Sequence, residues 1–181
     1  MLLPWGETTV IGHILSQWRE LGARQVAVVC RETDESLQGE LRRLGVPESE
    51  WIFNTSGEEM FSSIRLAAGW RWDPKLTHFG LVLGDQPQIR NRTLVRLMQV
   101  AEENREAICQ PSFAGRAKHP VILPGSQFLA LHSVEHGTLR NFLEASTHKR
   151  VLMECEDESL NVDLDTPKEY DAAAQKYVAK A

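Results

Sequence analysis

The sequence lacks several features that would place it in a common class. It has only three cysteines, Cys30, Cys109 and Cys155, and no two are spaced as Cys-x-x-Cys, which argues against a zinc site or a redox motif. Its longest apolar runs, at residues 26–30 and 79–83, are far too short to cross a membrane. No long run of like charge occurs, so the footprint of a general nucleic-acid binder is missing. We therefore expect neither a nucleic acid nor a membrane as partner.

Familiar catalytic and targeting motifs are absent as well. The chain contains no Gly-x-Gly-x-x-Gly fingerprint, no Walker A sequence and no Gly-x-Ser-x-Gly elbow. Its first residues, Met-Leu-Leu-Pro-Trp-Gly, have neither the basic start nor the long apolar stretch of a signal peptide. Each cysteine falls in an apolar, strand-like segment, so we expect three buried, reduced thiols and a cytoplasmic location.

The composition is that of an ordinary soluble domain, and the order of the predicted elements indicates an α/β fold. The chain has 181 residues, 42% of them apolar and 25% charged, with a net charge of −5, which suits one domain over residues 1–181. Strand patterns alternate with helical ones, which implies βαβ crossovers and helices on both faces of a sheet. Strands are predicted at residues 25–30, 51–53, 78–83, 107–110, 121–123, 150–155 and 160–164. Helices are predicted at residues 10–21, 37–44, 60–70, 94–101, 127–131, 138–143 and 166–179.

Two of these strands have a continuous apolar character, at residues 26–30 and 78–83. Strands that are buried on both faces have this pattern, whereas half-buried strands alternate. We therefore predict a three-layer α/β/α sandwich with a mostly parallel sheet that contains both strands, and an antiparallel edge in the second half of the chain. The expected cap of the first helix is Thr8 or Thr9, and Gly22 is expected to end that helix. The last helix is expected to start at Thr166-Pro167.

The strongest local signal for function is the turn Gly84-Asp85-Gln86-Pro87, which follows the second apolar strand directly. Ligands of open α/β sheets bind beyond the carboxyl ends of the strands, so Asp85 is expected at a binding edge. Gly84 permits close backbone approach, and a carboxylate at this place suits Mg²⁺, which takes one or two carboxylates together with phosphate oxygens. The alternative is an aspartate that only caps the turn.

A second group of carboxylates lies in Asn161-Val162-Asp163-Leu164-Asp165. If this segment is a strand, residues 161, 163 and 165 lie on one face and could line a site. The alternative is an edge strand with one wet face, followed by an Asp/Thr helix cap.

Two further segments could bind an anionic ligand. The predicted helix start at residues 60–65 carries Ser62, Ser63 and Arg65, and a helix N-terminus with spare N–H groups can hold a ribose, a base edge or a phosphate. The loop at residues 115–120 concentrates cations, Arg116 among them, beside His119 in an acidic protein. Ordinary helix capping by Ser62 and a solvated loop are the respective alternatives.

Taken together, these motifs resemble the MobA-like nucleotidyltransferases, and within them the molybdenum-cofactor cytidylyltransferase branch. The resemblance extends over nearly the whole chain and includes Gly69 in the helix predicted at residues 60–70. It is carried, in order, by residues 2–6, 60–65, 84–87, 115–123, 136–140 and 162–167.

The resemblance implies both a fold and a reaction. The fold is a Rossmann-like sheet of the nucleotide-diphospho-sugar transferase type. The reaction transfers a nucleoside monophosphate, CMP in this branch, from CTP to a phosphorylated acceptor, typically molybdopterin, with Mg²⁺ as cofactor and pyrophosphate as the second product. A partner in molybdoenzyme maturation is also implied. The resemblance implies that Asp85 and Asp163 bind the metal, with Asp165 as the alternative to Asp163. It implies nucleotide binding by Ser62, Ser63, Arg65 and Gly84. It implies acceptor binding by Arg116, His119 and Arg140.

The chain departs from the family at its beginning. The family opens with a strand that lies in the middle of the sheet and a Leu-Ala-Ala-Gly-type phosphate loop, and this sequence starts just after their expected position. From this we expect little nucleotide transfer by the chain as printed, together with unpaired strand edges. Two hypotheses follow. The first is an active nucleotidyltransferase whose initial strand and phosphate loop precede the printed start. The second is a non-catalytic truncated remnant or accessory protein that keeps the fold and binds a ligand or a partner.

Overall fold

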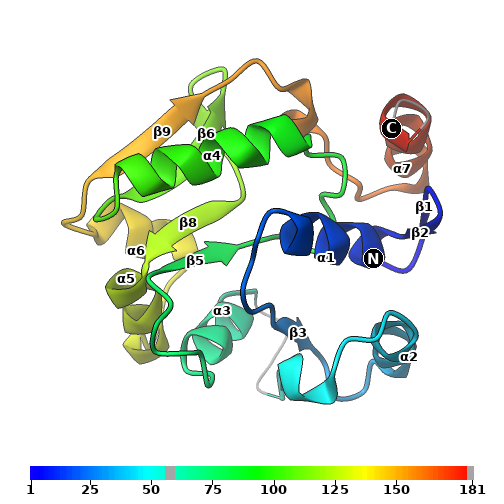
Figure 1. Ribbon diagram of the computed structural model, residues 1–181, viewed down its shortest axis with the longest axis horizontal. Helices are drawn as coiled ribbons and strands as arrows, with labels where there is room; N and C mark the ends of the chain where they lie inside the picture. The colour runs from blue at the N-terminus through cyan, green and yellow to red at the C-terminus, as the bar shows by residue number, and fades with distance from the viewer. Residues whose placement is uncertain (56–59, 179–181) are drawn as a thin grey trace.

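The computed structural model describes residues 1–55 and 60–178, and strands alternate with helices from α1 to β6 (Figure 1). The strands are β1 (Pro4–Trp5), β2 (Thr8–Thr9), β3 (Val28–Cys30), β4 (Trp51–Phe53), β5 (His78–Leu81), β6 (Ile108–Phe113), β7 (Arg116–Ala117), β8 (Val121–Pro124) and β9 (Arg150–Glu154). The helices are α1 (Val10–Glu20), α2 (Glu35–Arg43), α3 (Met60–Ala68), α4 (Asn91–Glu103), α5 (Gly125–Ala130), α6 (Leu139–Ala145) and α7 (Pro167–Ala173).

The central sheet is mixed. Strand β8 pairs antiparallel with both β5 and β6, while β9 pairs parallel with β6 and a short hairpin joins β6 to β7. The predicted α/β class is confirmed, but the sheet has more antiparallel pairing than we expected. The reason is the short connection between β6 and β8, because parallel neighbours need a crossover of a dozen or more residues.

Strands β3 and β4 form a separate two-stranded sheet. Strand β3 pairs parallel with β4, and within residues 1–55 and 60–178 no strand joins this pair to β5 by hydrogen bonds. The prediction that the two apolar strands share one hydrogen-bonded sheet is therefore wrong. Side-chain packing connects the two ladders instead, since Ile52, Phe61 and Phe79 belong to one buried cluster.

Helices cover both faces of the central sheet, as predicted. On β8, Ile122 packs into a cluster with Trp18 of α1 and Leu94 of α4. Its neighbours Val121 and Leu123 point the other way, into a cluster that includes residues of α3, α5 and α6. Figure 1 shows α4 crossing in front of the sheet. The three-layer arrangement follows from this alternation.

The local signals at helix ends are confirmed where the structure describes them. Thr9 caps α1 by accepting a hydrogen bond from the Gly12 N–H at 3.2 Å, and Gly22 follows the helix with a φ of +88°. Thr166 caps α7 through a capping box, with proline at the first helical position. Two of the three cysteines are buried, the third is half-buried, and all are free thiols. Among the described residues, no helix is long and apolar enough to cross a membrane.

The strand predicted at residues 160–164 is wrong. The chain forms a 3-10 turn over Glu158–Asn161 and then continues without regular structure. Asp157 begins this turn, because its carboxylate accepts hydrogen bonds from the backbone N–H of Ser159 at 3.1 Å and from its hydroxyl at 2.6 Å. Residues 161, 163 and 165 therefore do not share one face of a strand. The last helix is α7, which continues as a π-helix to Val178, and Ala179 lies outside the described residues.

Candidate functional site

Strand directions bring several predicted segments to one edge of the central sheet. Strands β5 and β6 both run antiparallel to β8, and β9 runs parallel to β6, so β5, β6 and β9 end at the same edge. Leu81 lies opposite Val121, which puts the turn after β5 beside His119, just before β8. This carboxyl edge is where open α/β sheets bind ligands.

Asp85 is exposed at this edge, in the turn that Gly84 begins. Gly84 itself is in close contact with the first residue of the chain: a Cβ atom built on it would lie 2.5 Å from the sulfur of Met1. Any side chain at position 84 would therefore displace Met1. The glycine is explained by this close approach, and Asp85 remains accessible to a ligand.

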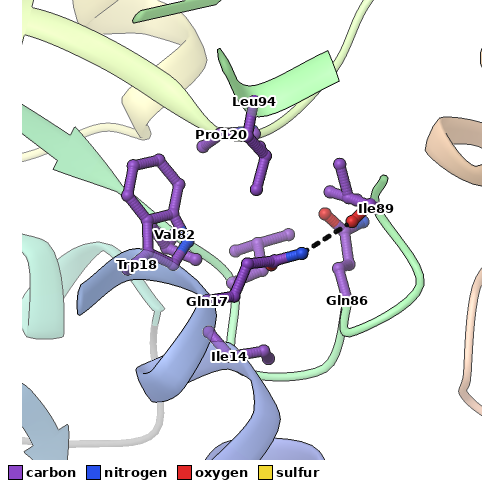
Figure 2. A pocket seen from close by; sticks show the side chains of 9 residues that line it. Ile14, Gln17, Trp18, Val82, Gln86, Ile89, Leu94 and Pro120 are labelled. Atoms are coloured by element: carbon purple, nitrogen blue, oxygen red, sulfur yellow. Dashed lines mark hydrogen bonds between the residues drawn. The ribbon is translucent and has the colours of Figure 1, made fainter. Parts of the chain in front are cut away.

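A buried glutamine on α1 holds the far end of the turn (Figure 2). The side-chain amide of Gln17, which is 6% exposed, donates to the carbonyl of Ile89 at 2.9 Å and to Asn91 Oδ1 at 2.7 Å. Between α1 and the turn lies a cavity of about 10 Å³ lined by Trp18 and Val82, among others, which is room for about one water molecule. Gln17 supports the turn, and the sequence analysis missed it.

A second glutamine connects the turn to the segment that carries the other carboxylates. The amide of Gln88 donates to the carbonyls of Ser159 at 3.2 Å and Val162 at 2.8 Å. Asp163 follows directly and is exposed, as is Asp165. The structure thus ties the segment of Asp163 to the turn of Asp85, and a shared metal ion between the two carboxylates stays a prediction.

His119 lies beside Asp85 with most of its ring buried. Burial lowers the pKa of His119, while the carbonyl of Leu81 and the negative charge of Asp85 act in the opposite direction. Its Nδ1 atom is buried and has no hydrogen-bond partner among the described residues. The neutral form of the imidazole is therefore favoured, because burial is the largest of these effects.

The cations of the loop around β7 differ in their surroundings. Arg116 lies in β7 and is exposed. Lys118 donates from Nζ to Asn161 Oδ1 at 2.8 Å, which adds a third connection to the segment of Asp163. Arg140 lies in the first turn of α6 with its side chain 85% exposed, and it pairs with Glu144 on the same helix at 3.6 Å. The described contacts thus connect Lys118, but not Arg140, to the carboxyl edge.

The predicted nucleotide-binding serines lie in the first turns of α3, so Ser62 is inside the helix and does not cap it. The side-chain amide of Asn54 donates to Ser62 Oγ at 2.8 Å and to Ser63 Oγ at 2.9 Å. Arg65 donates from Nη1 to the carbonyl of Glu135 at 3.1 Å, which ties α3 to the loop before α6. The serines and Arg65 thus form a second polar group, and Asn54 is a member that the sequence analysis missed.

The donor set at the carboxyl edge suits a hard divalent cation. Asp85 and Asp163 are exposed carboxylates, and Mg²⁺ is commonly held by one or two carboxylates while phosphates and water complete its shell. Among residues 1–55 and 60–178, no group of three His, Cys, Asp or Glu side chains is arranged to hold a metal ion. Two carboxylates, with other ligands completing the coordination shell, are the arrangement that these residues fit.

Comparison with known proteins identifies the domain. The profile of the MobA-like NTP transferase domain matches residues 1–151. A search of curated proteins finds no match.

Several solved structures share this fold, and some of them are named as nucleotidyl transferases. Rv0371c from Mycobacterium tuberculosis H37Rv, solved with manganese, is 23% identical, with 96% of this chain and 90% of that chain aligned and a TM-score of 0.69. A nucleotidyl transferase from Methanothermobacter is 17% identical over 99% of this chain and 85% of that chain, with a TM-score of 0.76. Molybdopterin-guanine dinucleotide biosynthesis protein A from Archaeoglobus fulgidus is 15% identical over 99% and 90%, with a TM-score of 0.67. These likenesses show the fold.

Proposed function

This chain belongs to the MobA-like NTP transferase family, and we propose that it transfers CMP from CTP to a phosphorylated acceptor such as molybdopterin, with release of pyrophosphate. The observation that carries the proposal is the carboxyl edge of the central sheet. There the exposed carboxylate of Asp85 acts electrostatically on the mostly buried ring of His119, and Gln88 of the same turn donates a hydrogen bond to Val162, next to Asp163.

Each part of the edge has a task in this proposal. Asp85, with Asp163, would hold Mg²⁺, which supplies charge neutralisation for the triphosphate. His119 and Arg116 would bind the acceptor or its phosphate. Arg140 is an exposed cation on α6, outside the described contacts of the edge, and would contribute to acceptor binding from there. Since phosphoryl transfer depends mainly on positioning and on oriented charge, no covalent intermediate with the protein is required.

The second polar group would bind the nucleoside. Ser62 and Ser63 would contact the base or the ribose, and Arg65 would face the phosphates. Gly84 would let the nucleotide approach the backbone of the turn. The CTP preference and the molybdopterin acceptor rest on the motif resemblance, and the fold supports them as compatible choices.

The test measures binding before turnover. Titration calorimetry with CTP, GTP and ATP in the presence of Mg²⁺ or Mn²⁺ should give tightest binding for CTP. Pyrophosphate release with CTP and molybdopterin should then depend on the divalent cation. Asp85→Asn should lower turnover by about 10² to 10³, the usual cost of one preorganised electrostatic contact.

A matched control separates the site from general charge effects. Asp171 is an exposed aspartate on α7, and Asp171→Asn makes the same change of charge away from the carboxyl edge. We expect it to leave turnover unchanged. Tight CTP binding without pyrophosphate release would instead identify a non-catalytic binding protein, and absence of nucleotide binding would refute the proposal.

A further inference from the structure

Gln88 is a buried glutamine in the turn that carries Asp85. It is 3% exposed, and its side-chain amide donates to the carbonyl of Val162 at 2.8 Å and to that of Ser159 at 3.2 Å. These hydrogen bonds join positions that are 74 and 71 residues apart in the sequence. Asp163 follows Val162 directly, so one side chain connects the two backbone segments that carry the exposed carboxylates.

The turn on one side of this connection is fixed by the rest of the fold. Ile89 is buried beside Gln88, and its carbonyl accepts a hydrogen bond from the Gln17 amide of α1 at 2.9 Å. Gln88 therefore extends from a turn that is itself anchored to a helix. Its hydrogen bonds can hold another segment at a defined place relative to Asp85.

The segment on the other side has few directional contacts of its own. No helix or strand is formed from Val162 to Thr166, where α7 is capped. Val162 and Leu164 are partly buried against the cluster of α1 and α4. Such apolar contacts are not directional, whereas a hydrogen bond constrains both distance and angle. The amide of Gln88 thus supplies the directional constraint next to Asp163.

Stability alone does not explain an amide at this buried position. The Oε1 atom of Gln88 is buried and has no hydrogen-bond partner among residues 1–55 and 60–178. An unpaired buried acceptor costs free energy, and an apolar side chain of the same length would avoid that cost. The glutamine is better explained by the position that its two hydrogen bonds fix.

We propose that Gln88 is a positioning residue for the divalent cation, which keeps the Asp163 carboxylate within reach of the cation that Asp85 binds. This rests on the proposed function, because it assumes that both carboxylates bind one cation. Gln88 does not touch the cation itself. It raises the affinity because a ligand that is already in place pays no ordering entropy when the cation binds.

The test is Gln88→Met, which keeps the length of the side chain and removes both hydrogen bonds. Mn²⁺ binding, measured by electron paramagnetic resonance without nucleotide, should weaken by about tenfold, at the lower end of the effect of losing a contact that supports a metal ligand. The matched control is Gln110→Met. Gln110 is 5% exposed and donates to the carbonyl of Lys118 at 3.2 Å, outside the connection between the carboxylates, so the Mn²⁺ affinity should not change.

A double-mutant cycle separates positioning from a general loosening of the fold. Asp163→Asn should weaken Mn²⁺ binding in the wild type and have a much smaller effect in Gln88→Met, because Asp163 is then no longer held in place. If Gln88 only stabilises the fold, the two effects should add. Asp171→Asn on α7 removes the same charge elsewhere and should have no effect in either background.

A second variant keeps the inference testable if Gln88→Met fails to fold. Gln88→Asn keeps an amide but is one methylene shorter, so it cannot hold both carbonyls at their present distances, and Mn²⁺ binding should again weaken. Wild-type affinity in a folded Gln88 variant, or additive effects in the cycle, overturns this inference alone. An Asp163→Asn protein with wild-type affinity overturns the shared cation as well, and a wild type that binds no Mn²⁺ overturns the metal site of the proposed function.

Discussion

Asp157 is a buried carboxylate that holds the segment leading to Asp163 in place. Its substitution therefore tests whether these contacts stabilise that part of the fold. The carboxylate is 3% exposed and accepts hydrogen bonds from Thr93 Oγ1 at 2.5 Å and from Ser159 Oγ at 2.6 Å. It also lies 3.5 Å from Arg90 Nε. These contacts fix the segment that leads to Asp163 against the start of α4.

The magnitude follows from what Asp157→Ala leaves behind. The variant removes the acceptor for Thr93 and Ser159 and the counter-charge of Arg90, and breaking a buried charged network typically costs about 3–5 kcal/mol. For a chain of this size, each kcal/mol lowers the melting temperature by about 2–4 °C, so we expect a fall of roughly 6–20 °C. Asp157→Asn keeps the shape and should cost roughly 1–3 kcal/mol.

The pH dependence gives a second, independent readout. Burial raises the pKa of Asp157, but the hydrogen bonds from Ser159 and Thr93 and the charge of Arg90 outweigh it, so the net shift is downward. A carboxyl group with a lowered pKa stabilises the fold above its unfolded pKa, about 3.9, and that contribution is lost as the pH falls through the folded value. The wild type should therefore lose its advantage over Asp157→Asn below about pH 4.

Urea unfolding of the wild type and of Asp157→Asn, at several pH values between 7 and 3, measures both effects. Equal midpoints at pH 7 would mean that the hydrogen bonds of Asp157 contribute nothing net. A difference that stays constant down to pH 3 would mean that its ionisation is irrelevant. Either result would refute the reasoning.

Three further predictions concern single residues. Gly69→Ala should lower the free energy of unfolding, measured in urea, by about 1–3 kcal/mol, because its Cβ would lie 2.3 Å from His132 Nδ1. In a His132→Ala protein the same substitution should have no such effect, and an equal loss of stability with and without His132 would contradict this. Because burial lowers the pKa of His119, unfolding stability should decrease as the pH falls below about 6.5, and His119→Asn should flatten the profile between pH 7.5 and 5.5. Thr166→Ala should lower the melting temperature by removing a helix cap, at a cost of about 1 kcal/mol that Thr166→Ser should largely restore.

The sequence predicted those parts of the fold that short-range chemistry determines. Thr166 and Pro167 begin a helix because a hydroxyl acceptor followed by a residue without an N–H group suits a helix start, whatever surrounds it. Gly22 ends α1 for a similar reason, since the chain there needs a positive φ. The position of Asp85 followed from an apolar strand that runs into a Gly/Pro turn, which is also a local pattern.

The direction of β8 could have been predicted but was not. Only the residues between Phe113 and Val121 separate β6 from β8, too few for a parallel crossover. The apolar pattern alone cannot give strand direction, because parallel and antiparallel strands buried on both faces have the same composition. Connection length was the missing signal.

The segment after β9 shows where local pattern fails. Apolar Val162 and Leu164 alternate with polar residues as they would in a strand, but Gln88 occupies the carbonyl of Val162 with its side chain. The side chain of Gln88 thus provides this carbonyl with a hydrogen-bond partner in place of a neighbouring strand. The competing partner lies 74 residues earlier in the chain, so no window of sequence around residue 162 contains the information.

The same argument applies to the residues that support the site. Gln17 lies on the apolar face of α1 and Asn54 follows a short strand, and neither position has a local pattern typical of function. Their partners lie 72 and about 8 residues away, and only the folded chain brings each amide to its acceptors. Motifs identify groups that can touch a substrate, whereas the groups that orient them depend on tertiary contacts.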